Sequence, residues 1–269
     1  TNSGIFTWRV DDVAADNYDL DSIRWTGTAY TEEANIISAS LFETLAGYDQ
    51  EEHRGSFYLY ASNRNPINSA GALYVTTTGD TFAGAANSPA GNARTGTRLK
   101  SFGGTLYAFI QVGTGTGTKD TITVESSVDP STTVFTVRTT GLSGVLRDVD
   151  TFFDQDETPR IVFLTENALY WYDTTNYVAN KLPVTLATAG RALVPARVNG
   201  IPALLIFMDG MRVYAYFADG SSWDISPGGS QGMPSGKDFG IDADGQVCVA
   251  SSGLGTYALW SGFDNGGTV

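Results

Sequence analysis

The amino-acid sequence predicts an all-β protein, a β-propeller of five to six four-stranded blades with about 45 residues in each blade. Three observations lead to this prediction. A hairpin of one pattern recurs along the chain, two further strands precede most copies of it, and the composition is typical of strands and turns. The 269 residues include 31 glycines and 12% aromatic residues but only 17% charged residues.

The recurring hairpin consists of a strand of alternating apolar and polar residues, a turn rich in Asp, Gly, Ser, Thr or Asn, and a second short strand. Its five copies cover 71–84, 120–137, 167–182, 211–226 and 256–269. The residues taken as equivalent are separated by 52, 43, 46 and 46 positions: Phe82, Val134, Tyr177, Trp223 and Val269. We expect this position, Trp223 for example, to pack between neighbouring blades.

The first two strands of a blade are expected before each hairpin. Candidate second strands are 56–62, 105–112, 160–165, 203–209 and 245–251. Candidate first strands are 97–102, 145–153, 192–198 and 238–242. A β-sandwich is the alternative, but it gives no reason for the same hairpin to recur at this spacing. The sequence therefore predicts a single propeller domain over 1–269.

The N-terminal segment 1–48 is expected to form a partial blade. Within it, 4–10 and 22–31 have the pattern of strands, and 34–48 fits either a strand with a loop or a short helix. The chain ends inside its last hairpin, at Val269. Two explanations remain open: a strand from the N-terminal segment completes the last blade, or the chain is part of a larger protein.

The hairpin turns resemble the Asp-box, Ser-x-Asp-x-Gly-x-Thr-Trp, of sialidase-like (BNR-repeat) propellers. The matching residues are Ser127, Asp129 and Thr133; Asp264, Gly266 and Thr268; and, more loosely, Gly79, Thr81 and Phe82, and Asp219, Ser222 and Trp223. The resemblance implies a propeller fold with these turns away from the ligand face. Because Asp side chains accept hydrogen bonds from the backbone of tight turns, Asp264 is predicted to form a turn rather than to catalyse a reaction.

Charge and composition exclude several functions. A formal net charge of −13 disfavours nucleic acid and anionic membrane surfaces as partners. No apolar run approaches the roughly 18 residues that a membrane-spanning helix needs, so no membrane insertion is expected. The single cysteine, Cys248, and the single histidine, His53, exclude cysteine zinc clusters and multi-histidine metal sites.

The sequence predicts no cofactor, with one candidate for Ca²⁺. Asp242 and Asp244, in the stretch DADG, are spaced like ligands of a hard cation. A hairpin turn explains the same residues, because a calcium site needs about six or more oxygen ligands. The acidic loop 11–21 is a second stretch of this kind.

Four residues are predicted to bind a ligand: Arg64, Asn65, Arg94 and Arg191. They fall in or next to connections from second to third strands or between blades. In an antiparallel blade these connections share one end, and the turns of Asp129, Asp219 and Asp264 share the other. Guanidinium groups that converge at one end would hold a carboxylate or sulfate group.

The function that the sequence predicts is a non-enzymatic binding or structural module. We expect an extracellular surface or virion component, of the phage-tail type, that contacts glycan or protein partners and belongs to a larger oligomeric assembly. The alternative is a sialidase-like glycoside hydrolase. That enzyme would need an arginine cluster for the substrate carboxylate, a Tyr–Glu pair as the nucleophile and an Asp as the acid. Nothing in this sequence marks three arginines as such a cluster. Whether the protein is an enzyme is left open, with binding favoured.

Overall fold

The computed structural model describes the chain in segments: 6–14, 17–25, 30–37, 45–63, 72–77, 83–89, 97–112, 121–154, 156, 158–198, 201–225, 236–241, 247–251 and 257–260. Side chains are described for those residues that lie within 49–60, 72–210 and 212–225. The chain divides into two compact units, Thr1–Ser143 and Gly144–Val269. In the part of the chain that is described, no helix is long and apolar enough to cross a membrane.

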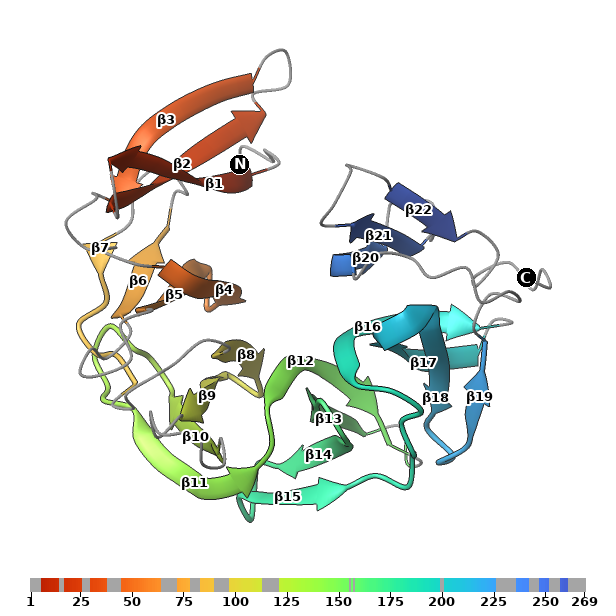
Figure 1. Cartoon of the computed structure of the whole chain (residues 1–269). Helices are drawn as coiled ribbons and strands as arrows, with labels where there is room; N and C mark the ends of the chain where they lie inside the picture. The colour runs from red at the N-terminus through yellow and green to blue at the C-terminus, as the bar shows by residue number, and fades with distance from the viewer. Residues whose placement is uncertain are drawn as a thin grey trace. The chain divides into compact units, whose positions relative to one another are not determined.

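The described residues of the first unit form three antiparallel sheets (Figure 1). The three-stranded sheet contains β1 (Phe6–Ala14), β2 (Asn17–Trp25) and β3 (Tyr30–Ile37). The next sheet contains β4 (Leu45–His53), β5 (Ser56–Asn63), β6 (Ala72–Thr76) and β7 (Ala83–Gly84). The third contains β8 (Arg98–Phe102), β9 (Thr105–Val112), β10 (Thr121–Ser127) and β11 (Thr136–Ser143).

The second unit repeats this organisation in its described residues. One four-stranded sheet contains β12 (Leu146–Phe153), β13 (Pro159–Thr165), β14 (Leu169–Asp173) and β15 (Val178–Lys181). The next contains β16 (Gly190–Val198), β17 (Ile201–Met208), β18 (Arg212–Phe217) and β19 (Ser222–Asp224), with the short 3-10 turn η2 (Asp209–Met211) between β17 and β18. A three-stranded sheet contains β20 (Gly236–Ile241), β21 (Val247–Ser251) and β22 (Tyr257–Trp260).

Every sheet is a simple meander in which consecutive strands are neighbours. This is the predicted order of a blade, and β9 coincides with the expected strand 105–112. The N-terminal segment differs in detail from a single partial blade. It supplies the three-stranded sheet β1–β3 and also the beginning of β4, which is the first strand of the next sheet.

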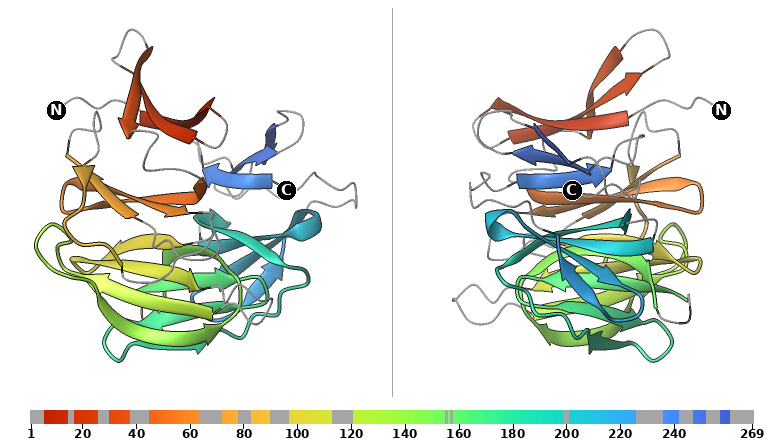
Figure 2. Two further views of the ribbon diagram at one scale, coloured as in Figure 1. Left: turned by 60° about the vertical axis from the view of Figure 1, so that its left-hand side comes forward. Right: turned by 90° about the vertical axis from the view of Figure 1, so that its right-hand side faces the viewer.

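The core of each unit lies between neighbouring sheets. The second strands β9, β13 and β17 are buried over most of their length, which explains why they are continuous apolar runs rather than alternating ones. In the second unit one apolar cluster joins Val162 and Leu164 of β13 to Leu204 and Ile206 of β17. The sheets β12–β15 and β16–β19 therefore pack face to face (Figure 2).

Carboxylates tie together the first strands of neighbouring sheets in both units. In the first unit the backbone N–H of Leu99 donates to Asp49 Oδ2 at 2.6 Å. In the second unit the N–H of Leu193 donates to Asp148 Oδ2 at 2.8 Å. A charged acceptor makes a stronger hydrogen bond than a neutral one, so these acidic side chains help to hold one sheet against the next.

The prediction that the residue after the hairpin turn packs between blades is wrong for Val134 and Trp223, whereas the equivalent Tyr177 is half-buried. Val134 is 66% exposed and Trp223 is 47% exposed. The indole of Trp223 contacts Phe217, with ring centroids 4.6 Å apart, but β19 is the edge strand of its sheet and all three of its residues are exposed. Trp223 therefore covers the rim of the core, and its removal should cost much less than the loss of a buried aromatic.

Candidate functional site

Aspartates in the hairpin turns hold the turns, as predicted. Asp129 Oδ1 accepts the backbone N–H of Ser131 at 3.0 Å, and Oδ2 accepts the hydroxyl of Thr132 at 3.0 Å. Asp219 Oδ1 likewise accepts the N–H of Ser221 at 2.8 Å. Asp173 does the same in the β14–β15 hairpin. Asp264 lies outside the described residues, and its role as a turn-former stays a prediction.

We expect Asp129→Ala to lower the melting temperature near neutral pH and to have little effect in acid. The backbone N–H of Ser131 and the hydroxyl of Thr132 lower the pKa of Asp129. A carboxyl whose folded pKa is lowered adds stability above its unfolded pKa of about 3.9, and this stability disappears as the pH falls through the folded pKa. Thermal melts of both proteins at neutral pH and at about pH 2 check this. An equal difference at both pH values would contradict it.

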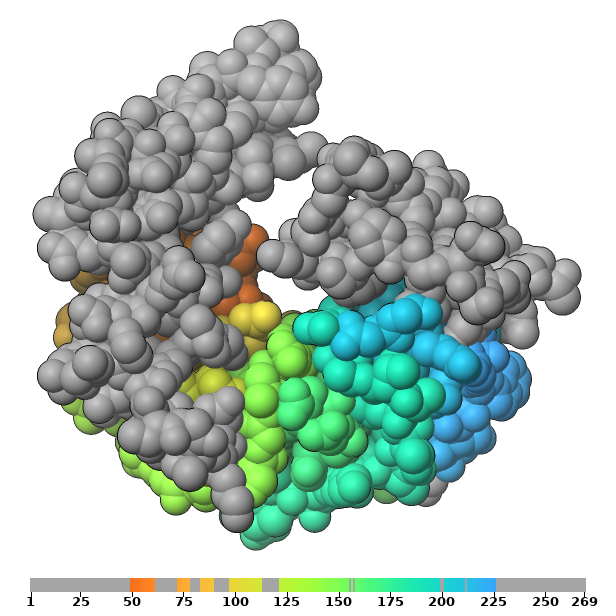
Figure 3. Space-filling model, viewed as in Figure 1, coloured from red at the N-terminus to blue at the C-terminus, as the bar shows by residue number. Residues whose placement is uncertain are grey.

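The second unit has two distinct ends. The β12–β13, β14–β15, β16–β17 and β18–β19 connections are at one end, which we call the hairpin end. The connections β13–β14, β15–β16 and β17–β18 are at the other, which we call the crossover end. Figure 3 shows that the residues of β12–β19, coloured green to blue, form a closely packed surface.

Arg191 lies at the crossover end, where the sequence prediction places it. Its guanidinium is held by Asp209, with Nε–Oδ1 and Nη2–Oδ2 distances of 2.6 and 2.9 Å. The hydrogen bonds that Arg191 donates to Asp209 are the main reason why the pKa of Arg191 is raised. Arg147 and Glu166 form a second, longer ion pair of 3.4 Å at this end. In these two pairs each guanidinium is matched by a carboxylate.

The other predicted site residues are not described. Arg64, Asn65 and Arg94 lie outside the described segments, as do Asp242 and Asp244, so their roles in ligand and Ca²⁺ binding stay predictions. In the described part of the chain, no three His, Cys, Asp or Glu residues are grouped as metal ligands would be.

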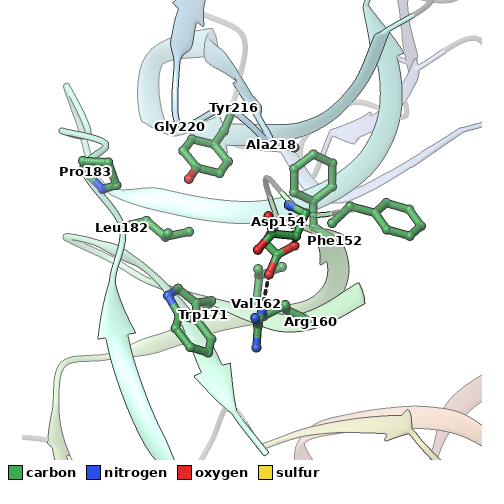
Figure 4. Close-up of a pocket in the computed structure, with 12 residues that line it drawn as sticks. Phe152, Asp154, Arg160, Val162, Trp171, Leu182, Pro183, Tyr216, Ala218 and Gly220 are labelled. Carbon is green, nitrogen blue, oxygen red and sulfur yellow. Dashed lines mark hydrogen bonds and ion pairs between the residues drawn. The ribbon is translucent and has the colours of Figure 1, made fainter. Parts of the chain in front are cut away.

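A cavity of about 290 Å³ opens between the sheets β12–β15 and β16–β19 (Figure 4). Most of its wall is apolar. The β12–β15 sheet contributes Phe152, Phe153, Val162 and Trp171, the β15–β16 connection contributes Leu182 and Pro183, and the second sheet contributes Tyr216, Ala218 and Gly220. Phe152 and Tyr216 meet edge to face, with centroids 6.3 Å apart. This packing fixes the aromatic surface before any ligand arrives.

The polar edge of the cavity is an ion pair beside Trp171. Arg160 Nε donates to Asp154 Oδ2 at 2.6 Å, and the guanidinium carbon lies 4.5 Å from the centroid of the Trp171 ring. Asp154 Oδ1 also accepts the backbone N–H groups of Asp156 and Thr158. Because its neighbours hold each of these groups, the edge is preorganised.

Burial and hydrogen bonding act in opposite directions on Asp154. Burial alone would raise the pKa of its carboxyl, but the hydrogen bonds from Thr158, Arg160 and Asp156 outweigh burial and lower it. Burial raises the pKa of Tyr216, and nearby Asp219 adds to the effect. At neutral pH the cavity therefore presents the Asp154 carboxylate beside the Arg160 guanidinium, together with the neutral phenol of Tyr216.

Sequence reasoning missed this cavity. Phe152, Trp171 and Tyr216 come from three strands of two sheets, and each has the apolar pattern of an ordinary core residue. Only Asp154 and Arg160, which flank the turn between β12 and β13, offered a local signal in the sequence. The charged edge of the cavity, Asp154 and Asp156, lies in the β12–β13 connection at the hairpin end, which the Asp-box resemblance implied to be away from the ligand. Leu182 and Pro183 extend the lining toward the crossover end.

No family model matches the chain, and no curated protein matches it significantly. Solved structures do resemble it. The Trypanosoma rangeli sialidase in complex with 2,3-difluorosialic acid is 10% identical with a TM-score of 0.56, over 94% of this chain and 53% of that one. A GH74 enzyme of Niastella koreensis is 14% identical with a TM-score of 0.56, over 87% and 39%. YCF48 bound to D1 peptide is 10% identical with a TM-score of 0.54, over 98% and 86%.

These similarities establish the fold. The similar structures are β-propellers, and the meandering four-stranded sheets of this chain are their blades. The protein is therefore an all-β propeller, as the sequence predicts. The chain spans about half of the sialidase and less of the GH74 enzyme. At identities of 10–14% the likeness carries the fold and not the activity.

Proposed function

We propose that this propeller is a non-enzymatic binding module that takes a group of a glycan or protein partner into the cavity between β12–β15 and β16–β19. The observation that carries the proposal is the cavity itself, an apolar and aromatic wall with one fixed ion pair at its edge. Few polar groups on an apolar surface are typical of a site that orients a ligand.

The chemistry of the cavity favours binding over catalysis. A general acid must hold a proton at the working pH, and the lowered pKa of Asp154 keeps this carboxyl ionised. Its oxygens already accept hydrogen bonds from Arg160 and from two backbone N–H groups. Asp154 is thus suited to accept a further hydrogen bond from a ligand and not to serve as a general acid.

The second candidate is a sialidase-like glycoside hydrolase with its site at the crossover end. The observation in its favour is the meeting there of Arg147, Glu166, Arg191 and Asp209. Arginines would hold an acidic sugar, and carboxylates are the catalytic groups of most glycosidases. In this structure, however, the guanidinium of Arg191 binds Asp209 of the same chain.

The placement of the module on an extracellular surface or a virion, within a larger oligomer, is part of the same proposal. Its support is the composition, which is acidic and rich in glycine. Light scattering of the purified chain measures the oligomeric state directly, and a monomer at all concentrations would contradict the assembly.

The substitution Ala218→Trp tests the cavity as the binding site. Ala218 lines the cavity, and an indole there would fill much of it. The matched control is Val178→Trp, which adds the same group to a 49% exposed position at the hairpin end, outside the cavity lining. Both variants are compared with the parent on a glycan array after circular dichroism has shown that they are folded.

We expect Ala218→Trp to weaken binding of the array ligand by about tenfold or more, and Val178→Trp to leave binding unchanged. Equal binding by all three proteins would exclude the cavity as the site. Fluorogenic glycosides are assayed in parallel. If the protein releases the fluorophore and Arg191→Ala abolishes this release, the hydrolase is the correct function and the non-enzymatic binding module is excluded.

A further inference from the structure

We infer that the cavity between β12–β15 and β16–β19 binds one neutral pyranose ring through two neighbouring hydroxyl groups and rejects acidic sugars. The inference rests on the proposed binding function and specifies its ligand class. Three features of the cavity carry it: its size and apolar wall, the donor and acceptor at its edge, and its charge.

The size and wall of the cavity fit a single ring. Its volume of about 290 Å³ is at the lower end of the range for small-molecule sites. Trp171, Tyr216 and Phe152 line it with aromatic carbon, and Figure 4 shows Tyr216 and Trp171 on two sides of the same space. The C–H face of a pyranose is flat and apolar, so it packs against such a wall without leaving a hydroxyl unsatisfied.

The edge of the cavity offers an acceptor next to a donor. Asp154 and Arg160 are joined by a 2.6 Å hydrogen bond through Nε. Within the described residues the terminal nitrogens of the guanidinium have no hydrogen-bond partner, so they can donate to a ligand. A hydroxyl group both donates and accepts. Of two neighbouring hydroxyls on a ring, one donates to the Asp154 carboxylate while the next accepts from Arg160. Charged partners make both bonds stronger than neutral ones.

The charge of the cavity separates neutral from charged ligands. Asp154 and Asp156 against Arg160 leave one net negative charge in the lining. A sugar carboxylate placed there meets like charge from two aspartates. An ammonium or guanidinium group of a basic peptide would instead be repelled by Arg160, which is already paired with Asp154. A neutral ring avoids both repulsions.

Direct titration with small sugars tests the inference. The neutral probes are methyl β-glucopyranoside, methyl β-galactopyranoside and methyl α-mannopyranoside. Methyl β-glucuronide is the acidic counterpart of the glucopyranoside, with a carboxylate in place of its hydroxymethyl group. Saturation-transfer NMR detects binding, and tryptophan fluorescence follows it. We expect at least one neutral pyranoside to bind with a Kd of about 1 mM, as suits a ligand of this size, and the glucuronide to bind about tenfold more weakly than its match.

Two variants separate the roles of the edge groups. Arg160→Met removes the guanidinium donors and should weaken binding of the neutral sugar about tenfold, whereas Arg212→Met is its matched control and should leave binding unchanged. Arg212 pairs with Asp224 at 2.9 Å in the same unit but does not line the cavity. Asp156→Asn removes a negative charge, so the glucuronide should gain affinity and the neutral sugar should not.

The glucuronide binding as tightly as its neutral match would overturn the inference, as would the absence of saturable binding of all three neutral pyranosides. In either case the proposed binding function is still supported if the parent protein binds an array ligand and Ala218→Trp does not. If no array ligand is sensitive to Ala218→Trp, the proposed function fails independently of the sugar class.

Discussion

Replacing His53 with alanine is expected to lower the free energy of unfolding by about 2–4 kcal/mol. His53 ends β4 and is 1% exposed. Its Nε2–H donates to the carbonyl of Val128 at 3.0 Å, and Nδ1 forms a hydrogen bond with the hydroxyl of Ser101 at 2.9 Å. Three segments of the first unit therefore meet at this one ring.

The loss combines two costs. Alanine leaves the Val128 carbonyl without the imidazole donor, and it leaves a space where the ring packs beside Tyr58, with centroids 6.1 Å apart. Denaturant unfolding, followed by circular dichroism, measures the effect. The control Ser101→Ala removes only the hydroxyl partner of Nδ1 and should cost about 1 kcal/mol. A loss below about 1 kcal/mol for His53→Ala would show that the ring is not an anchor of the first unit.

Replacing Gly190 with alanine is expected to cost about 1–3 kcal/mol through overpacking in the second unit. Gly190 is the first residue of β16 and is buried. A Cβ atom there would lie 2.9–3.0 Å from Cγ, Cδ1 and Cδ2 of Leu164. Leu164 is fully buried in the cluster between the two sheets, so its side chain has little room to move away.

A matched glycine and a double mutant test the mechanism. Gly84→Ala, whose new Cβ meets no atom within 4 Å, should change stability little. Combining Gly190→Ala with Leu164→Ala removes the clash, so the pair should destabilise by less than the sum of the single changes. Additive losses would attribute the cost of Gly190→Ala to something other than contact with Leu164.

The two ends of the second unit have different chemistry, and this bears on where a ligand binds. At the crossover end the arginines are matched by carboxylates of the chain, Asp209 for Arg191 and Glu166 for Arg147. On the side of the hairpin end a hollow between two sheets keeps an aromatic wall beside the Asp154–Arg160 pair. If a ligand binds in this cavity, the paired charges of the crossover end remain available to stabilise the fold or to contact a second partner.

The strands and turns were predictable because their causes are local in sequence. Alternation of apolar and polar residues, or a short continuous apolar run, marks a strand, and β9 and β13 were found within a residue of their ends. The turn at Asp129 was predictable for the same reason, since its hydrogen bonds reach only Ser131 and Thr132. The recurrence of this local pattern then indicated a propeller.

The sequence by itself thus determined the blades, their order and the role of the turn aspartates. Only the tertiary structure decided which side chains meet across sheets. Trp223 is exposed because β19 is an edge, Arg191 is paired because η2 brings Asp209 to it, and the cavity exists because Trp171 and Tyr216 come from sheets that pack together. Such contacts join residues about 20 to 50 positions apart, and their energies depend on the packing of whole sheets, which no short sequence pattern records.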